Sequence, residues 1–133
     1  MTSTGLASLL HRWLRGCRVL VVEDEPIIAL AIEDMLLDLG CEVIGPATAL
    51  PEANRLAAEA DLDAAVLDVN MGGGNTSESV AAILRSRNVP LCFSTGYRPE
   101  QMPGGFESAP LIHKPYSSES LAAVLHGLIS VPR

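Results

Sequence analysis

The chain has 133 residues, the length of a single domain, and 48% of them are apolar but only 4% aromatic, so its core must be aliphatic. Nine basic against sixteen acidic residues leave a net charge of −7, which argues against nucleic acid or an anionic membrane as a partner. No apolar run reaches the roughly 18 residues of a membrane span, and the N-terminus lacks a secretory signal pattern. We therefore expect a cytoplasmic protein. The odd number and wide spacing of Cys17, Cys41 and Cys92 favour reduced, buried thiols over a disulfide framework or a zinc site.

Residues 1–16 stand apart from the rest of the chain. Leu6, Leu9, Leu10, Trp13 and Leu14 recur at helical spacing and predict a short amphipathic helix. Such a helix can pack on the domain that follows, fray as a tail, or dock a partner, a second copy of the chain included. We treat 1–16 as an N-terminal extension and 17–133 as one domain.

From residue 17 onward, short β-branched runs alternate with longer segments of helical period. This alternation is typical of a parallel sheet with crossover helices. Because such crossovers are right-handed, the pattern predicts an open, doubly wound α/β sandwich. The five predicted strands cover 18–22, 42–44, 64–67, 91–93 and 111–113.

Four helices are predicted around these strands. The first begins at Pro26 and ends at Gly40. The second begins at Pro51, the third follows Ser77 as its N-cap, and the last follows Ser117. On the first helix, the expected inward face comprises Ile28, Ala31, Ile32, Met35 and Leu39. Between the last two strands, residues 96–110 carry so much proline and glycine that only a degraded helix of a turn or two is expected.

Reactive side chains follow four of the five predicted strands. Glu23 and Asp24 end the first strand, Asp68 the third, Thr95 the fourth and Lys114 the fifth. In an open parallel sheet, the carboxyl ends of the strands lie along one edge, where ligands bind. Three carboxylates, a hydroxyl and an ammonium should therefore face one shallow cleft.

Three carboxylates in one cleft repel one another unless a cation offsets their charge. Mg²⁺ suits them, since it takes one or two protein carboxylates and fills its remaining positions with water or phosphate oxygens. The backbone carbonyl of Asn70 is a further candidate ligand. A carboxylate beside bound Mg²⁺ can attack phosphorus and form an acyl phosphate, with Lys114 and Thr95 contacting the phosphoryl oxygens.

Each of these pieces has a plainer explanation when it is taken alone. The acidic pair Glu23–Asp24 suits the N-terminal end of a helix dipole. Asp68 can be an ordinary loop acid, Lys114 a solvated turn residue, and Thr95 a buried hydroxyl. Their joint occurrence, each at a strand end, favours the catalytic interpretation over these separate ones.

These segments together resemble a response-regulator receiver domain of two-component signalling. The matching motifs are VLVVEDEP (19–26), VLDVNMGGG (66–74), FSTGY (93–97) and HKPY (113–116), and the resemblance covers about 17–133. It implies a flavodoxin-like sheet of order 2-1-3-4-5. It also implies a phosphoprotein that takes its phosphoryl group from a sensor histidine kinase or a histidine phosphotransfer protein.

The resemblance also assigns roles to individual residues. Asp68 corresponds to the phospho-acceptor, and the pair Glu23–Asp24 to the acidic Mg²⁺ site. Thr95 resembles the switch hydroxyl that moves toward the phosphoryl group, with the small Gly96 beside it leaving room. Lys114 resembles the lysine that pairs with the phosphate.

Some positions depart from the usual receiver pattern. The aromatic residue expected three positions before the lysine is Leu111, so Tyr97 is a candidate replacement. Pro115 follows the lysine, where receivers carry a cis-proline, but the proline often found four residues after the acceptor is Gly72. The Phe-x-Thr-Gly strand and its proline-rich successor resemble the FAT GUY subgroup, in which single-domain regulators are common.

The expected function is that of a stand-alone, Mg²⁺-dependent phospho-accepting switch rather than an enzyme. It would serve as a phosphorelay intermediate, a phosphate sink or an adaptor for an unidentified downstream protein, and a homodimer is possible. One alternative is a pseudo-receiver that binds partners without phosphorylation. An aspartyl-nucleophile phosphatase is disfavoured because Asn70 stands where its general acid would be. A nucleotide-binding module is disfavoured because the first strand lacks a glycine-rich loop.

Overall fold

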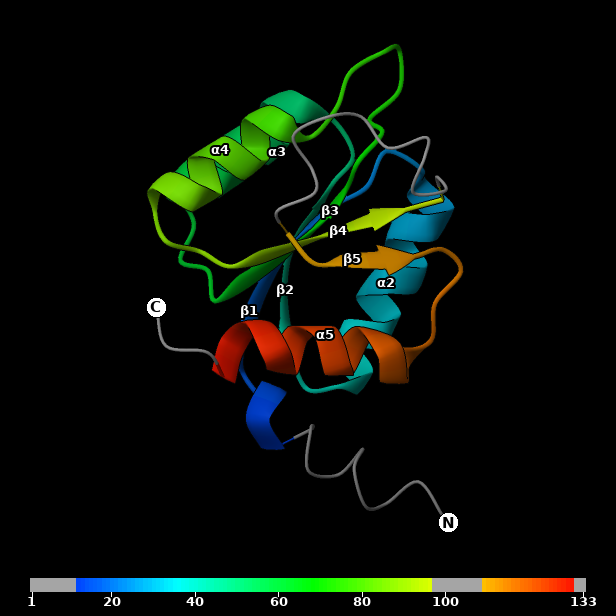
Figure 1. The fold of residues 1–133 in the computed structure, drawn as a ribbon, viewed down its shortest axis with the longest axis vertical. Helices are drawn as coiled ribbons and strands as arrows, with labels where there is room; N and C mark the ends of the chain where they lie inside the picture. Colours follow the sequence, from blue (N-terminus) through cyan, green and yellow to red (C-terminus); the bar gives the residue numbers. More distant parts are fainter. Residues whose placement is uncertain (1–11, 97–108, 131–133) are drawn as a thin grey trace.

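A computed structural model of the chain describes residues 12–96 and 109–130 (Figure 1). Its centre is a five-stranded parallel sheet of order β2-β1-β3-β4-β5, which confirms the predicted doubly wound arrangement. The strands are β1 (Arg18–Val22), β2 (Glu42–Ala47), β3 (Ala64–Asp68), β4 (Leu91–Thr95) and β5 (Leu111–His113). Among the described residues, no helix is both long enough and apolar enough to cross a membrane.

Three strands continue past their predicted C-terminal ends. β1 and β5 have the predicted bounds, whereas β3 includes Asp68, β4 includes Thr95, and β2 reaches Ala47. The added residues are part of the sheet because they pair with the neighbouring strand, as Asp68 does with Ser94. The residues added to β3 and β4 have polar side chains, which give no apolar signal, and β2 adds Gly45 and Pro46, which are typical of turns. Hydrophobic periodicity therefore ends all three strands too early.

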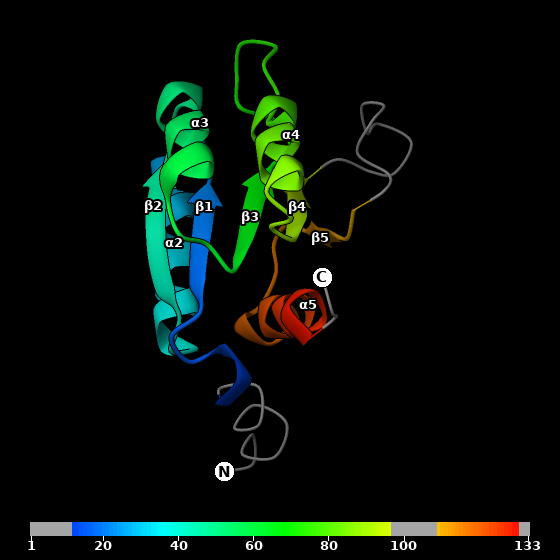
Figure 2. The ribbon, with the colours of Figure 1, turned by 90° about the vertical axis from the view of Figure 1, so that its left-hand side faces the viewer.

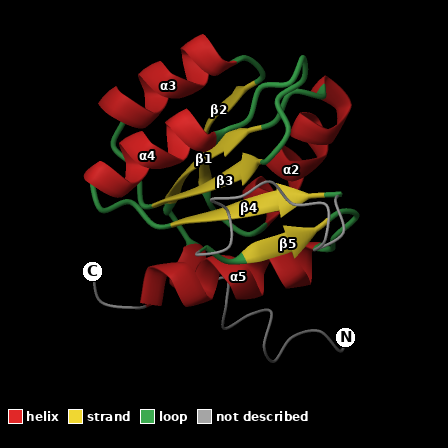
Figure 3. Cartoon of the chain, turned by 45° about the horizontal axis from the view of Figure 1, so that its top comes forward, coloured by secondary structure: helices red, strands yellow, loops and turns green. Residues whose placement is uncertain are grey.

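Four helices cover the two faces of the sheet: α2 (Pro26–Asp38), α3 (Leu50–Glu59), α4 (Glu78–Ser86) and α5 (Ser118–Ser130). Figures 2 and 3 show α3 and α4 on one face and α2 and α5 on the other. Each face has its own aliphatic core, and Phe93 is the one aromatic side chain fully buried among the described residues. The predicted aliphatic core is therefore present in two layers.

The inward face of α2 differs from the predicted one. Its buried side chains are Ala29, Ile32 and Leu36, whereas Ala31 is exposed. The prediction of Ala31 as an inward residue was therefore wrong. The helix reads PIIALAIEDMLLD, and with apolar residues on nearly every side its period does not define a single face.

The helix starts also refine the prediction. Ser77 occupies the N-cap of α4, but its side chain makes no capping hydrogen bond. Ser117 does cap α5, since its hydroxyl accepts a hydrogen bond from the Ser120 backbone at 3.1 Å. The second helix begins at Leu50, one residue before Pro51.

The N-terminal segment contacts the domain where it is described. Residues 12–14 are helical, and Leu14 is completely buried in the core layer of α2 and α5. The Trp13 ring meets the His126 ring edge to face, with centroids 5.4 Å apart. The remainder of the predicted N-terminal helix, residues 1–11, lies outside the described residues, as does 97–108 of the predicted degraded helix.

The packing of α2 can be tested with two adjacent leucines. Leu36 is fully buried, whereas Leu37 is 53% exposed. We predict that Leu36→Ala lowers the free energy of unfolding by about 2–5 kcal/mol, because it leaves a cavity in the core. Leu37→Ala is the matched control and should change it by less than about 1 kcal/mol. Equal losses in urea denaturation would contradict the orientation of α2.

Candidate functional site

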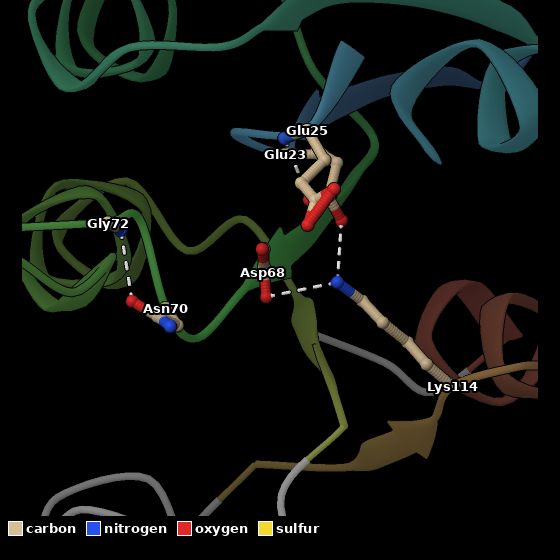
Figure 4. A network of polar contacts seen from close by, with 6 residues as sticks. All are labelled: Glu23, Glu25, Asp68, Asn70, Gly72 and Lys114. Carbon is tan, nitrogen blue, oxygen red and sulfur yellow. Dashed lines mark hydrogen bonds and ion pairs between the residues drawn. The ribbon is translucent and has the colours of Figure 1, made fainter. Parts of the chain in front are cut away.

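The carboxyl edge of the sheet brings the predicted reactive residues together. Asp24, Asp68, Thr95 and Lys114 line one open cleft of about 340 Å³, and Glu23 is buried next to Lys114. The cleft is also lined by Glu25, Ile28, Asn70 and Gly96. Figure 4 shows the Lys114 side chain reaching across from the end of β5 toward β1 and β3.

Lys114 joins two carboxylates of the site. Its ammonium donates to Glu23 Oε1 at 2.8 Å and lies 3.3 Å from Asp68 Oδ1 (Figure 4). Burial alone would lower the pKa of Lys114, but the hydrogen bond and charge of Glu23 and the charge of Asp68 raise it overall. Lys114 is therefore held in its charged form, between β1 and β3.

The pKa of the Asp68 carboxyl is raised as well, but for a carboxyl this favours the uncharged form. Burial is the main factor that raises its pKa to about 8, and its hydrogen bond with Glu23 and the charge of Glu23 raise it further. The charge of Lys114 lowers the pKa of Asp68 but does not cancel these effects. Without a further cation, Asp68 is therefore an acid that resists ionisation near neutral pH.

The chemistry of the donors fits a hard divalent cation. One carboxylate oxygen from each of Glu23, Asp24 and Asp68 lies within 4.8 Å of the others, a spacing at which one ion can contact them. Both oxygens of Glu23 are already engaged, by Lys114 and by the backbone N–H of Glu25 at 3.1 Å. Asp24 and Asp68 are thus the better candidates for direct ligands.

The loop after Asp68 borders the cleft at Asn70. The Asn70 side-chain oxygen accepts a hydrogen bond from Gly72 N at 2.9 Å, so this side chain stabilises the turn (Figure 4). Gly72 has a φ of +83°, and a Cβ there would lie 3.2 Å from Asp24 Oδ2. The glycine that replaces the usual receiver proline therefore allows the loop to approach the acidic pair closely.

Two cleft residues were not predicted from the sequence. Glu25 and Ile28 line the cleft because α2 begins immediately beside it, at Pro26. The predicted helix start at Pro26, directly after the acidic pair, is the sequence signal that could have identified them. Of the remaining predicted positions, the Lys114–Pro115 peptide bond is cis, and Tyr97 lies outside the described residues.

A model of the response regulator receiver domain matches residues 19–126 of the chain. The chain belongs to this family. The phyllosphere-induced regulator PhyR of Methylorubrum extorquens is 34% identical over 111 residues, which are 80% of this chain and 41% of that protein. The receiver domain thus spans about two fifths of the length of this curated relative.

Solved receiver structures match its fold closely. SdrG of Sphingomonas melonis has 34% identity and a TM-score of 0.75, over 85% of this chain and 96% of that one. The receiver domain of the sensor histidine kinase PA1611 of Pseudomonas aeruginosa has 25% identity and a TM-score of 0.77, over 87% and 99%. That structure contains a magnesium ion coordinated in its active-site cleft.

The raised pKa of Asp68 predicts how the stability of the metal-free receiver depends on pH. A carboxyl that binds its proton more tightly when folded stabilises the protein at low pH, and this contribution is lost between about pH 4 and about pH 8. In EDTA, the thermal midpoint of the wild type should therefore fall across this range. The thermal midpoint of Asp68→Asn, whose side chain cannot ionise, should fall less. Near pH 8 this variant should exceed the wild type in free energy of unfolding by at least about 1 kcal/mol. Parallel melting curves for the two proteins would contradict this electrostatic account.

Proposed function

We propose that this receiver is a signalling switch that accepts a phosphoryl group on Asp68 from a phosphohistidine protein. The observation that supports it best is the position of Asp68, which lies in an open cleft with one carboxylate oxygen 3.3 Å from the Lys114 ammonium. A carboxylate in that position can reach an incoming phosphorus atom while a cation neutralises the oxygens that arrive with it.

The transfer requires no further reactant. A carboxylate oxygen of Asp68 bonds to phosphorus as the bond between phosphorus and the donor's imidazole nitrogen breaks. The nitrogen keeps the bonding electron pair, and the ring leaves as neutral imidazole because its other nitrogen carries a proton; the product on Asp68 is an acyl phosphate. Lys114 pairs with one phosphoryl oxygen, and the Thr95 hydroxyl donates to another. The small Gly96, beside Thr95 on the cleft wall, leaves room for Thr95 to move toward the phosphoryl group.

Asp24 and Asp68 would hold Mg²⁺, with Glu23 beside them and the backbone carbonyl of Asn70 as a further ligand. When it is bound, the ion offsets the charge of the acidic cluster and of the phosphoryl oxygens. The coordination of magnesium in the cleft of the PA1611 receiver supports this assignment. So does the spacing of the three carboxylates here.

The receiver has a surface next to the cleft that suits the binding of a donor protein. An apolar groove of about 230 Å³ lies between α2 and the segment after β5, and it shares Ile28 and Lys114 with the cleft. Ile27, which also lines the groove, is 82% exposed. A partner that covers this groove would present its phosphohistidine at the acceptor, so we assign the groove to a histidine kinase or phosphotransfer protein.

The strand sequence Phe-Ser-Thr-Gly-Tyr supports the further proposal that this receiver is a member of the FAT GUY subgroup. Leu111 occupies the position of the usual inward-turning aromatic and lies partly buried against the core. The rearrangement on phosphorylation would therefore depend on Thr95 and its neighbours rather than on an aromatic at 111. A cytoplasmic relay intermediate, phosphate sink or adaptor, acting alone or as a dimer, is consistent with such a switch.

Phosphoryl uptake can be measured without knowing the donor. We expect the protein to gain one phosphate from acetyl phosphate with Mg²⁺, by intact mass, and to gain none in EDTA. Asp68→Asn should abolish uptake, whereas Asp38→Asn, at the exposed end of α2, is the matched control and should leave it unchanged. Absence of uptake in the wild type would favour the phosphorylation-independent pseudo-receiver, and uptake by Asp68→Asn would refute the assignment of the acceptor.

The donor surface yields a separate prediction. Ile27→Glu should slow phosphoryl transfer from a phosphohistidine protein by about tenfold, because it places a charge in the apolar groove. Its uptake from acetyl phosphate should not change. Leu37→Glu is the control, since Leu37 is exposed on the same helix but does not line the groove. Equal slowing of both donors by Ile27→Glu would mean that the groove does not dock the partner.

A further inference from the structure

Residues 70–76, which join β3 to α4, form a tight hairpin beside the cleft (Figure 2). The two ends of this β3–α4 hairpin pair as an antiparallel bridge. Inside the bridge, Met71 N donates to the Asn75 carbonyl and Asn75 N donates to the Gly72 carbonyl, each at 2.9 Å. Met71 is also buried in the core layer of α3 and α4. The hairpin is therefore fixed by its own backbone pairing and by a side chain in the core.

The β3–α4 hairpin meets the acidic pair at Gly72. A Cβ at this position would lie 3.2 Å from Asp24 Oδ2, so close that the carboxylate would have to move by a few tenths of an ångström. Gly74 has nearly the same backbone conformation, with a φ of +81° against +83° at Gly72, but a Cβ there would meet nothing within 4 Å. Of these two glycines, only Gly72 has Asp24 in the space that a side chain would need.

The Asn70 side chain holds Gly72 in this place. Its oxygen accepts the hydrogen bond from Gly72 N at 2.9 Å, which closes the turn that begins the hairpin (Figure 4). The Asn75 side chain belongs to the same hairpin but is exposed and lies next to Gly73. A continuous set of contacts thus leads from the Asn70 side chain through the Gly72 backbone to the Asp24 carboxylate.

The position of the Asp24 carboxylate matters for the site. One of its oxygens lies within 4.8 Å of a carboxylate oxygen of Asp68, and these two residues are the best candidates for direct ligands of a cation. Mg²⁺ requires a near-ideal octahedron of oxygens at about 2.0–2.1 Å, so a shift of a few tenths of an ångström is large for this ion. Groups that orient a metal ligand typically contribute roughly 10- to 100-fold to metal affinity.

We propose that Asn70 and Gly72 are positioning residues of the metal site. The Asn70 side chain holds Gly72, and Gly72, because it has no side chain, leaves the Asp24 carboxylate where it can bind the cation. This inference rests on the proposed Mg²⁺-dependent function. It gives the Asn70 side chain a role separate from that of its backbone carbonyl. It also accounts for a glycine where receivers often carry proline, whose φ is fixed near about −65° and cannot reach +83°.

The test titrates the full chain with Mg²⁺ alone and follows its backbone amide signals by NMR. Gly72→Ala should raise the half-saturating Mg²⁺ concentration by about tenfold. Gly74→Ala is the matched control, because its Cβ is strained by a similar positive φ without contacting Asp24, and it should stay within about twofold of the wild type. Both variants should lower the melting temperature of the metal-free protein by similar amounts, which separates an effect on the site from one on folding.

The role of the Asn70 side chain is tested in the same titration. Asn70→Ala should also raise the half-saturating Mg²⁺ concentration by about tenfold, although it retains the backbone carbonyl. Asn75→Ala is its control and should leave the concentration unchanged. Equal affinities in Gly72→Ala and Gly74→Ala would overturn the inference and leave the proposed function intact, and an unchanged affinity in Asn70→Ala would refute the role of that side chain. If the wild type itself did not bind Mg²⁺, the proposed function would fail and this inference with it.

Discussion

The contact on which the site depends is the one between the Lys114 ammonium and the acidic cluster. Glu23 is fully buried and Asp68 nearly so, and burying two carboxylates without a cation would strongly destabilise the fold. Lys114 compensates for part of that charge, at 2.8 Å from one carboxylate and 3.3 Å from the other. The pKa of Asp68 stays raised nevertheless, so one cation is too few for the cluster. The divalent ion that we propose for this site would supply the missing positive charge.

The parallel sheet explains how residues 91 positions apart come to share this contact. Strands β1 and β4 flank β3, so the ends of these three strands place acids and a hydroxyl side by side, and the lysine arrives from the edge strand β5. On one face of the sheet, α2 borders both the cleft and the apolar groove, so the acidic cluster lies directly beside an apolar surface.

Much of this arrangement could be predicted from the residues alone. Alternating strand and helix patterns indicate to within a few residues where the strands end, and a parallel sheet brings those ends together, so Asp24, Asp68 and Lys114 could be grouped from the sequence. The face of α2 could not be predicted, because a helix that is apolar at nearly every position has no single periodic stripe.

The most direct test of the central claim is to locate the covalent bond itself. Borohydride reduces an acyl phosphate of aspartate to homoserine, so protein treated with acetyl phosphate and Mg²⁺ can be reduced, digested and mapped by peptide mass spectrometry. The account predicts homoserine at position 68, formed only when Mg²⁺ is present. Homoserine at another acidic position, or an acid-stable phosphate on a serine or threonine, would contradict it.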